Sequence, residues 1–216
     1  EFLREGAAIS DFMRPDRVVI GVESEKAKNK LTELYRPLNL RETPILISNL
    51  ESAELIKYAS NAFLATKISF INEIANLCET LGADVHDIAK GMGMDRRIGP
   101  KFLHPGPGYG GSCFPKDTRA LLSFAEESGH ELGIVRATIE ANNNQLAKMS
   151  EKIKSALNLS NNNQKIAVLG LTFKPETDDI RESPSLSLLP DLVRAGVTIQ
   201  AHDPKGLDAA KQVLPS

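Results

Sequence analysis

The chain has 216 residues, of which 41% are hydrophobic and 25% are charged, and its net charge is only −2. This length and composition suit a globular protein with one large or two small domains. The small net charge and the lack of a long basic stretch argue against nucleic acid and anionic membranes as partners. No apolar run approaches the roughly 20 residues that span a bilayer, and two cysteines make no disulfide framework. We therefore expect a soluble protein of the cytoplasm.

The first fifty residues alternate between strand and helix patterns. A short β-rich run at 17–21 is followed by a helical pattern from Ser24 to about Tyr35 and by a second apolar run at 44–48. This order predicts an α/β fold that begins with the tail of a Rossmann-like domain, at residues 1–50. No Gly-x-Gly-x-x-Gly follows a strand pattern, and the chain has no initiator methionine, so we expect a fragment of a longer protein.

A helical period starts at Ser52 and predicts a central, all-helical domain at residues 51–160. Its apolar stripe includes Phe63 and Cys78, so Cys78 is interpreted as a packed core thiol. Lys57 and Asn61 lie one turn apart on another face of the same helix. A Lys–Asn pair at this spacing is usually only solvent-exposed. A helix this long, with bulky side chains, needs another part of the protein to cover its surface. A second subunit would provide that cover.

The stretch from Gly106 to Asp117 is the most unusual in the chain. Four glycines occur within six positions, and a lone cysteine, Cys113, follows them. Pro115 suits the first residue of a helix, which would place Cys113 just before the helix N-terminus. Unsatisfied N–H groups, the helix dipole and Lys116 would then favour the nucleophilic thiolate. The residues alone leave open that this is no more than a glycine-rich loop.

The last part of the chain predicts a βαβ motif. A strand pattern at 165–170 is followed by a helix pattern at 185–194 and by a second strand pattern at 197–203. This motif would open a second Rossmann-like domain, at residues 161–216. His202 and Asp203, at the end of the second strand, are interpreted either as ribose contacts or as a structural cap.

Several stretches together resemble one family. Gly-Tyr-Gly-Gly-Ser-Cys-Phe-Pro-Lys-Asp, with Arg-Arg-Ile-Gly upstream, Glu-Phe-Leu-x-Glu-Gly at the start and Lys-x-x-x-Asn on the long helix, is similar to the UDP-glucose/GDP-mannose dehydrogenase family of nucleotide-sugar 6-dehydrogenases. The resemblance implies a four-electron, NAD-dependent oxidation of a sugar C6 alcohol to a carboxylate through a cysteine thiohemiacetal and thioester. The residue sequence around Arg96 and in the glycine-rich loop favours UDP-glucose as the substrate and UDP-glucuronate as the product, over GDP-mannose or UDP-N-acetylmannosamine as substrates.

The resemblance also implies roles for single residues. The implied catalytic residues are Cys113, Lys57, Asn61, Asp117 and Glu1. The implied substrate contacts are Phe2, Leu3, Glu5, Ile68, Arg97, Phe102, Gly106, Tyr109, Gly110, Phe114, Phe173 and Lys174. The implied NAD contacts are Glu5, Cys113, Lys116 and Arg181, and no residue is assigned to a metal.

The resemblance further implies a homodimer through the central helical domain, with Arg97 reaching into the neighbouring site. We expect the fragment alone to lack turnover, and a non-catalytic oligomerisation or substrate-binding module stays as the alternative function.

Overall fold

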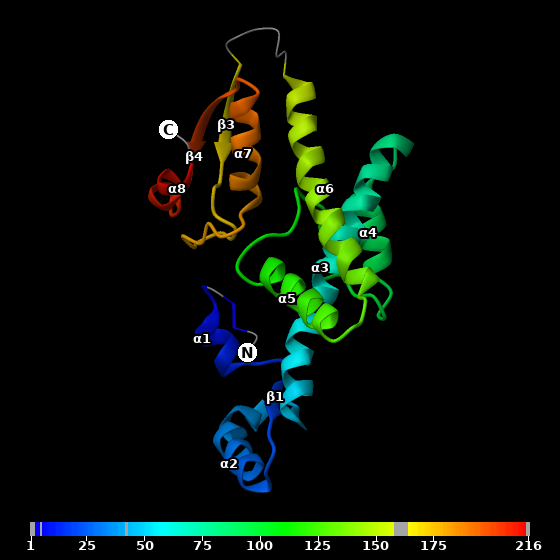
Figure 1. The fold of residues 1–216 in the computed structure, drawn as a ribbon, viewed down its shortest axis with the longest axis vertical. Coiled ribbons are helices and arrows are strands. Elements are labelled where there is room, and N and C mark those ends of the chain that lie inside the picture. The colour runs from blue at the N-terminus through cyan, green and yellow to red at the C-terminus, as the bar shows by residue number, and fades with distance from the viewer. Residues whose placement is uncertain (1–2, 5, 42, 158–163, 215–216) are drawn as a thin grey trace. The chain divides into compact units, whose positions relative to one another are not determined.

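A computed structural model describes residues 3–4, 6–41, 43–157 and 164–214 (Figure 1). The chain is mixed α/β and divides into two compact units, Glu1–Ser60 and Asn61–Ser216. The boundary between the units falls within one long helix. Among the described residues, no helix combines the length and the apolar character that crossing a bilayer requires.

The first unit is a small parallel α/β layer. Its elements are α1 (Ala8–Met13), β1 (Val18–Gly21), α2 (Glu25–Tyr35), the 3-10 helix η1 (Arg36–Arg41) and β2 (Ile45–Ser48). The two strands run parallel, with Val18 opposite Ile45. Ser24 caps α2 by accepting a hydrogen bond from the Ala27 N–H. The strand–helix–strand order predicted for this region is therefore confirmed.

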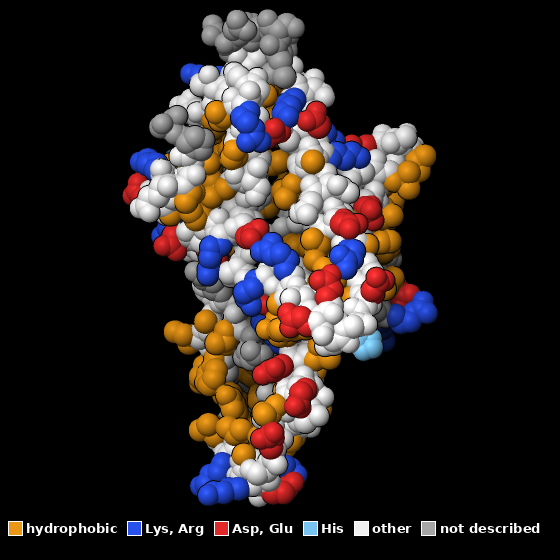
Figure 2. Space-filling model, in the orientation of Figure 1, with side chains coloured by type: hydrophobic (Ala, Val, Ile, Leu, Met, Phe, Trp, Pro, Cys, Tyr) orange, Lys and Arg blue, Asp and Glu red, His pale blue; other side chains and the backbone are white. Residues whose placement is uncertain are grey.

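The first unit leaves much apolar surface uncovered. Figure 2 shows hydrophobic side chains gathered in the lower part of the view. The large exposed hydrophobic residues of the first unit include Ile9, Phe12, Met13 and Leu34. A two-stranded sheet has too little surface to bury them, and such sheets are marginally stable alone. This unit thus has the elements of an α/β domain without enough strands to enclose a core.

The second unit starts with helices. These are the rest of α3 (Leu50–Leu81), then α4 (Val85–Gly93), α5 (Phe114–Glu127) and α6 (Gly133–Ala156). Asp84 caps α4 by accepting a hydrogen bond from the His86 N–H, and α4 runs to Gly93. Helix α5 begins at Phe114, one residue before Pro115, so Cys113 is its N-cap as expected.

The contact between α3 and α6 is largely polar. Every buried residue of α6 is polar, namely Thr138, Asn142, Gln145 and Ser150. Between the two helices, the Ser69 hydroxyl donates to the Thr138 carbonyl at 3.2 Å. Cys78 is buried, which confirms it as a core thiol, whereas Phe63, expected in the same stripe, is 66% exposed.

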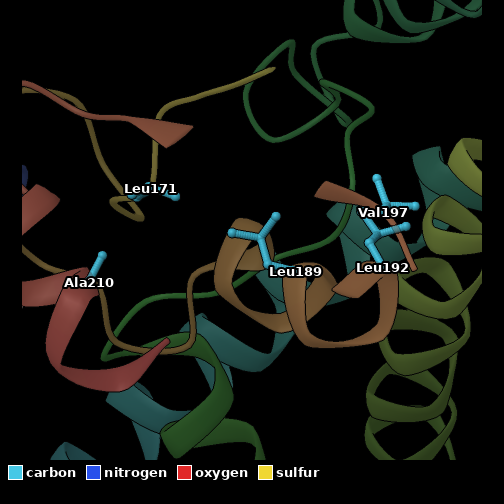
Figure 3. Close-up of a cluster of buried hydrophobic side chains, with 5 residues drawn as sticks. All are labelled: Leu171, Leu189, Leu192, Val197 and Ala210. Carbon is cyan, nitrogen blue, oxygen red and sulfur yellow. The ribbon is translucent and has the colours of Figure 1, made fainter. Parts of the chain in front are cut away.

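The predicted βαβ motif is confirmed and closes the second unit. It comprises β3 (Lys165–Leu169), α7 (Pro184–Arg194) and β4 (Thr198–His202), and is followed by α8 (Leu207–Val213), which was not predicted. The strands are parallel, with Lys165 opposite Thr198. Its core is a cluster of Leu171, Leu189, Leu192, Val197 and Ala210 (Figure 3). Ile153 and Leu157, at the end of α6, pack against this cluster and join the helices to the βαβ motif.

Candidate active site

Cys113 lies at the exposed N-terminus of α5. Its sulfur is 3.8 Å from the Ser112 hydroxyl, and its carbonyl accepts the Asp117 N–H at 2.8 Å in the first turn of the helix. The first N–H groups of a helix have no intrahelical partner and carry the positive end of the dipole. The thiol is therefore accessible in a position that suits a nucleophile, in contrast to the buried Cys78.

Asp117, one turn after Cys113, is a buried carboxylate with two partners. Its side chain is only 1% exposed. One oxygen accepts the Asn61 amide at 2.5 Å, and the other accepts the Lys116 ammonium. A buried charge is costly unless it is paired and hydrogen-bonded, and these partners supply both. The structure thus brings Asn61, Lys116 and Asp117 together at the first turn of the cysteine-capped helix.

Several predicted residues belong to the first unit. Lys57 lies on α3 one turn before Asn61, and Leu3 precedes α1. Glu1, Phe2 and Glu5 lie outside the described residues.

A cavity of about 650 Å³ lies beside the segment Gly106–Cys113, which we call the thiol loop. Six predicted substrate contacts line it: Ile68, Phe102, Tyr109, Gly110, Phe114 and Phe173. It is also lined by residues to which we assigned no role, including Lys101, His104, Thr172 and Ser183. The Phe114 ring meets Phe102 and Tyr109 edge to face, with centroids 6.0 and 6.2 Å away. The cavity therefore has an aromatic wall that includes Phe114, the residue after Cys113, whereas Cys113 itself does not line it.

Two glycines of the thiol loop are required by close packing. A Cβ on Gly110 would lie 2.0 Å from the Glu182 carbonyl oxygen, and one on Gly111 would lie 2.4 Å from the Phe173 ring. Phe102 (φ 65°) and Glu182 (φ 49°) have left-handed backbones, which non-glycine residues adopt at a cost. The loop is thus pressed tightly against the segment that follows β3.

Side-chain amides that we did not predict hold the start of the thiol loop. Asn72 of α3 accepts the Gly106 N–H at 2.8 Å, and Gln145 of α6 donates to the Gly106 carbonyl at 2.8 Å. Asn142 accepts the Tyr109 N–H at 2.7 Å and donates to its carbonyl at 3.1 Å. The run of three asparagines and a glutamine at 142–145 interrupts the helix's apolar pattern, and that interruption was the available signal.

Tyr109 is buried, and its burial shifts the pKa of its hydroxyl. Burial raises its pKa above the ordinary value, and this outweighs the opposing effects of a hydrogen bond with Thr118 and the charge of Arg119. The phenol therefore stays protonated at neutral pH.

Asp203 acts as a structural cap at the end of β4. Its carboxylate accepts backbone N–H groups of Leu171, Thr172, Lys205 and Gly206 at 2.7 to 3.0 Å. Burial alone would raise its pKa, but these hydrogen bonds outweigh burial and hold the pKa well below the ordinary aspartate value. Of the two interpretations of Asp203, these contacts favour the cap, because its oxygens bind the backbone.

Two predicted arginines are exposed but oriented by aspartates. Arg181 binds Asp179 at 2.8 Å, and its side chain is 59% exposed while that of Asp179 is 3% exposed. Arg97 binds Asp95 at 2.5 Å, and its side chain is 88% exposed.

Two residues predicted as substrate contacts, Gly106 and Lys174, do not line the cavity.

Comparison with known proteins gives one family along the chain. Three of its domain models match: the NAD binding domain at 1–39, the central domain at 51–144 and the UDP binding domain at 167–215. A UDP-glucose 6-dehydrogenase of Rhizobium meliloti is 52% identical, covering 99% of this chain and 49% of the relative. One from Bacillus subtilis is also 52% identical, covering 100% and 48%.

Solved structures agree with these matches. A UDP-glucose dehydrogenase from Pyrobaculum islandicum has 41% identity and a TM-score of 0.93, covering 99% of this chain and 49% of that chain. A UDP-D-ManNAc dehydrogenase from Pyrococcus horikoshii has 31% identity and a TM-score of 0.82, covering 94% and 48%. The chain spans about half the length of the curated relatives it matches. Because all three matching models come from one family, the chain belongs to the UDP-glucose/GDP-mannose dehydrogenase family.

Proposed function

We propose that this chain carries the substrate cavity and catalytic thiol of an NAD-dependent dehydrogenase that oxidises C6 of UDP-glucose to give UDP-glucuronate. One observation carries the proposal. An exposed thiol caps a helix whose first turn holds a buried carboxylate bound to Asn61 and Lys116, and Phe114, beside that thiol, lines a cavity of about 650 Å³. The names of the relatives direct the choice of substrate.

The thiol solves the central chemical difficulty of this reaction. An alcohol becomes an acid through an aldehyde, which must be retained between two oxidations. The Cys113 sulfur adds to the aldehyde carbon and forms a thiohemiacetal. Loss of a hydride from that carbon leaves a thioester, and water then breaks the carbon–sulfur bond to release the carboxylate and restore the thiol. The overall change consumes one water and releases two hydrides and three protons.

The neighbouring polar residues are proposed to stabilise the negatively charged oxygens of these intermediates and to activate the water. Lys57 and Asn61 are proposed to stabilise the alkoxide and the thioester oxyanion. Asp117, together with Glu1, is proposed to orient and deprotonate the hydrolytic water. The hydrogen bond from the Asn61 amide to Asp117 gives Asn61 a second task, which is to orient that carboxylate.

NAD⁺, when bound, accepts the hydride in each oxidation. In this chain the family's NAD binding domain matches residues 1–39, which hold β1 and α2 of the parallel β1–β2 layer, whereas β3 and β4 lie in the UDP binding domain. The segment after β3 carries Arg181, whose exposed guanidinium suits a phosphate because Asp179 fixes its orientation. Lys116 is proposed as a further NAD contact, and Glu5 as one from the start of the chain.

The cavity wall suits a nucleotide sugar. Phe102, Tyr109 and Phe114 offer aromatic faces. Phe173, whose ring lies against Gly111, also lines the cavity, and Lys174, next to it, is proposed to contact the substrate. Ile68, Gly106 and Gly110, with Phe2 and Leu3, are proposed as further substrate contacts.

Substitution of Cys113 tests the proposal. In a form of the protein that oxidises UDP-glucose, Cys113→Ser should lower UDP-glucuronate formation by a factor on the order of a thousand or more, because the serine hydroxyl is a far weaker nucleophile. Cys78→Ala, at the buried thiol, is the matched control and should retain acid formation. UDP-glucuronate released by Cys113→Ser at the control's rate would refute the role of the thiol.

The 216 residues by themselves are proposed to lack turnover, since they span about half the length of the relatives. Purified chain mixed with UDP-glucose and NAD⁺ should produce no NADH absorbance above the background without protein. Sustained NADH formation would contradict this and show that the chain carries every catalytic part.

The second candidate substrate is UDP-N-acetylmannosamine, which one structural neighbour of lower identity is named for. GDP-mannose is the further alternative from the family name. NADH formation by an active form of the protein should be at least about tenfold faster with UDP-glucose than with either, by kcat/KM. A preference for another nucleotide sugar would change the substrate without affecting the role of Cys113.

A second copy of the chain is the proposed partner of the exposed face of α3. Phe63, Phe70 and Leu77 follow a seven-residue spacing there and are 66%, 45% and 52% exposed. By light scattering, Phe70→Glu should give half the mass of the wild type, while Glu73→Gln on the same helix should keep it. A wild-type monomer would refute this partner.

A further inference from the structure

The thiol loop is held at its start by side chains of two helices instead of by a neighbouring strand. Four hydrogen bonds of 2.7 to 3.1 Å join Asn72, Asn142 and Gln145 to the backbone of Gly106 and Tyr109. We propose that these three amides, which we call the amide clamp, are positioning residues that fix the cavity wall and the Cys113 thiol. The proposal rests on the proposed function only in taking Cys113 as the reacting group.

Asn142 provides the strongest part of the clamp. It is 6% exposed, and its oxygen and nitrogen pair with the N–H and the carbonyl of the same residue, Tyr109. A neighbouring β-strand would satisfy Tyr109 in the same way. A Cβ on Gly108, whose φ is +130°, would lie 2.9 Å from the Asn142 oxygen. The glycine is therefore needed for the loop to come this close to α6.

Asn72 and Gln145 both form hydrogen bonds with the backbone of Gly106, one with its N–H and the other with its carbonyl. Asn72, which is 1% exposed, accepts the Gly106 N–H, and Gln145 donates to the Gly106 carbonyl. The Gln145 oxygen in turn accepts the Asn76 amide at 2.8 Å, which fixes which way the Gln145 amide points. Both helices thus hold the same loop residue.

The clamp lies close to the reacting group along the chain. Only Gly110, Gly111 and Ser112 separate Tyr109 from Cys113. The Tyr109 ring packs against Phe114, on the other side of the thiol. The loop is therefore anchored by the clamp at one end and by α5 at the other, and releasing the clamp frees the end that carries the cavity wall.

Other interactions hold α3 against α6, so loss of the clamp should act locally. The Thr66 and Thr138 hydroxyls hydrogen-bond at 2.9 Å, Ser69 donates to the Thr138 carbonyl, and Glu79 pairs with Lys152. These contacts do not involve the thiol loop. The clamp amides are buried polar groups committed to the loop, whereas the helix pairing has its own bonds.

Hydrogen exchange of the full 216-residue chain, followed by mass spectrometry, tests the clamp. Asn142→Leu leaves the Tyr109 N–H and carbonyl without this partner, so amides at 106–112 should exchange about tenfold faster or more. Asn144→Leu is the matched control, because it makes the same substitution at an exposed position of α6. It should leave exchange at 106–112 unchanged, and both variants should leave peptides of β3, α7 and β4 unchanged.

A second variant keeps the clamp testable if Asn142→Leu fails to fold. Gln145→Glu keeps the oxygen that accepts from Asn76 but removes the donor to the Gly106 carbonyl. Exchange at 106–112 should then rise severalfold, less than in Asn142→Leu. Wild-type exchange at the loop in both variants, or an equal rise throughout the second unit, would overturn the positioning role.

Alkylation of Cys113 by iodoacetamide separates this inference from the proposed function. UDP-glucose should slow alkylation of the wild type and of Asn144→Leu, and Asn142→Leu should need about tenfold more UDP-glucose for the same protection. If UDP-glucose protects Asn142→Leu at wild-type concentrations, the clamp does not shape the cavity. If UDP-glucose protects no form, the proposed substrate site is wrong, while the exchange experiment still decides whether the amides fix the loop.

Discussion

Two parts of the second unit are stabilised in opposite ways. The βαβ motif buries Leu171, Leu189, Leu192 and Val197 in one apolar cluster (Figure 3). The region where α3, α6 and the thiol loop meet, in contrast, buries the amides and hydroxyls of Asn72, Thr138, Asn142 and Gln145. Apolar burial gives a large, non-directional stabilisation, whereas a hydrogen bond gives a smaller net gain but fixes direction.

This difference indicates which of the two regions requires its atoms to stay in fixed positions. The apolar cluster can tolerate small shifts, because dispersion and burial depend weakly on the angles between side chains. The polar contact cannot, because its amides lose their bonds when the Gly106–Tyr109 backbone moves. The directional contact is the one that holds the thiol loop.

The largest effect is expected in the apolar cluster. Leu192 is 1% exposed, so Leu192→Ala should lower the free energy of unfolding by about 2 to 5 kcal/mol through lost burial and a cavity. Val193→Ala, at the next position and 43% exposed, is the matched control and should cost less than about 1 kcal/mol. Urea unfolding followed by circular dichroism measures both, and similar losses would mean that the cluster is not the main core.

The next effect tests a polar anchor inside the apolar motif. Asp203→Asn weakens the charged hydrogen bonds to Leu171 and Gly206 and should cost about 1.5 to 3 kcal/mol near neutral pH. Because folding lowers the Asp203 pKa, its contribution is present above the ordinary value near 4 and is lost as pH falls below it.

The stability difference between wild type and Asp203→Asn should therefore shrink between about pH 5 and pH 2. Urea midpoints at several pH values measure it. A difference that stays constant over this range would show that the carboxylate's charge is not what holds the backbone.

The two regions also differ in how well the sequence predicts them. The strand patterns at 165–170 and 197–203 predict both strands of the βαβ motif, and Ser24 and Cys113 mark helix starts that the structure confirms. These signals are local, since each depends on residues within a few positions. Helix α8 was missed, because its segment is only seven residues long and shows no strong apolar period.

The amide clamp was missed for a different reason. An asparagine on a helix is ordinarily solvated, and the partner of Asn142, which is Tyr109, lies 33 residues away in the sequence, beyond the reach of any local pattern. The same limit affected α3, where Phe63 fits a buried stripe by period but is exposed. Periodicity gives the face of a helix on which a residue lies, but not which face the rest of the chain covers.

A smaller effect is expected from a hydroxyl in the α3–α6 contact. Thr138→Val keeps the side chain's shape but removes hydrogen bonds to Thr66 and to the Ile134 carbonyl, both at 2.9 Å. Thr66 retains its bond to the Ala62 carbonyl, so the cost should be about 1 kcal/mol. Urea unfolding measures it, and a loss as large as that of Leu192→Ala would erase the contrast between the two regions.

The smallest effect is expected at the ion pair that joins α5 to the segment before α7. Arg119 and Glu182 are 2.7 Å apart, with side chains 56% and 50% exposed, so water and salt screen their attraction. A double-mutant cycle of Arg119→Gln and Glu182→Gln should give a coupling below about 0.5 kcal/mol, decreasing further in salt. Because Gly110 lies against the Glu182 carbonyl, close packing already joins these segments without the charges. A coupling above about 1 kcal/mol that resists salt would instead make the ion pair a fixed part of the junction beside the thiol loop.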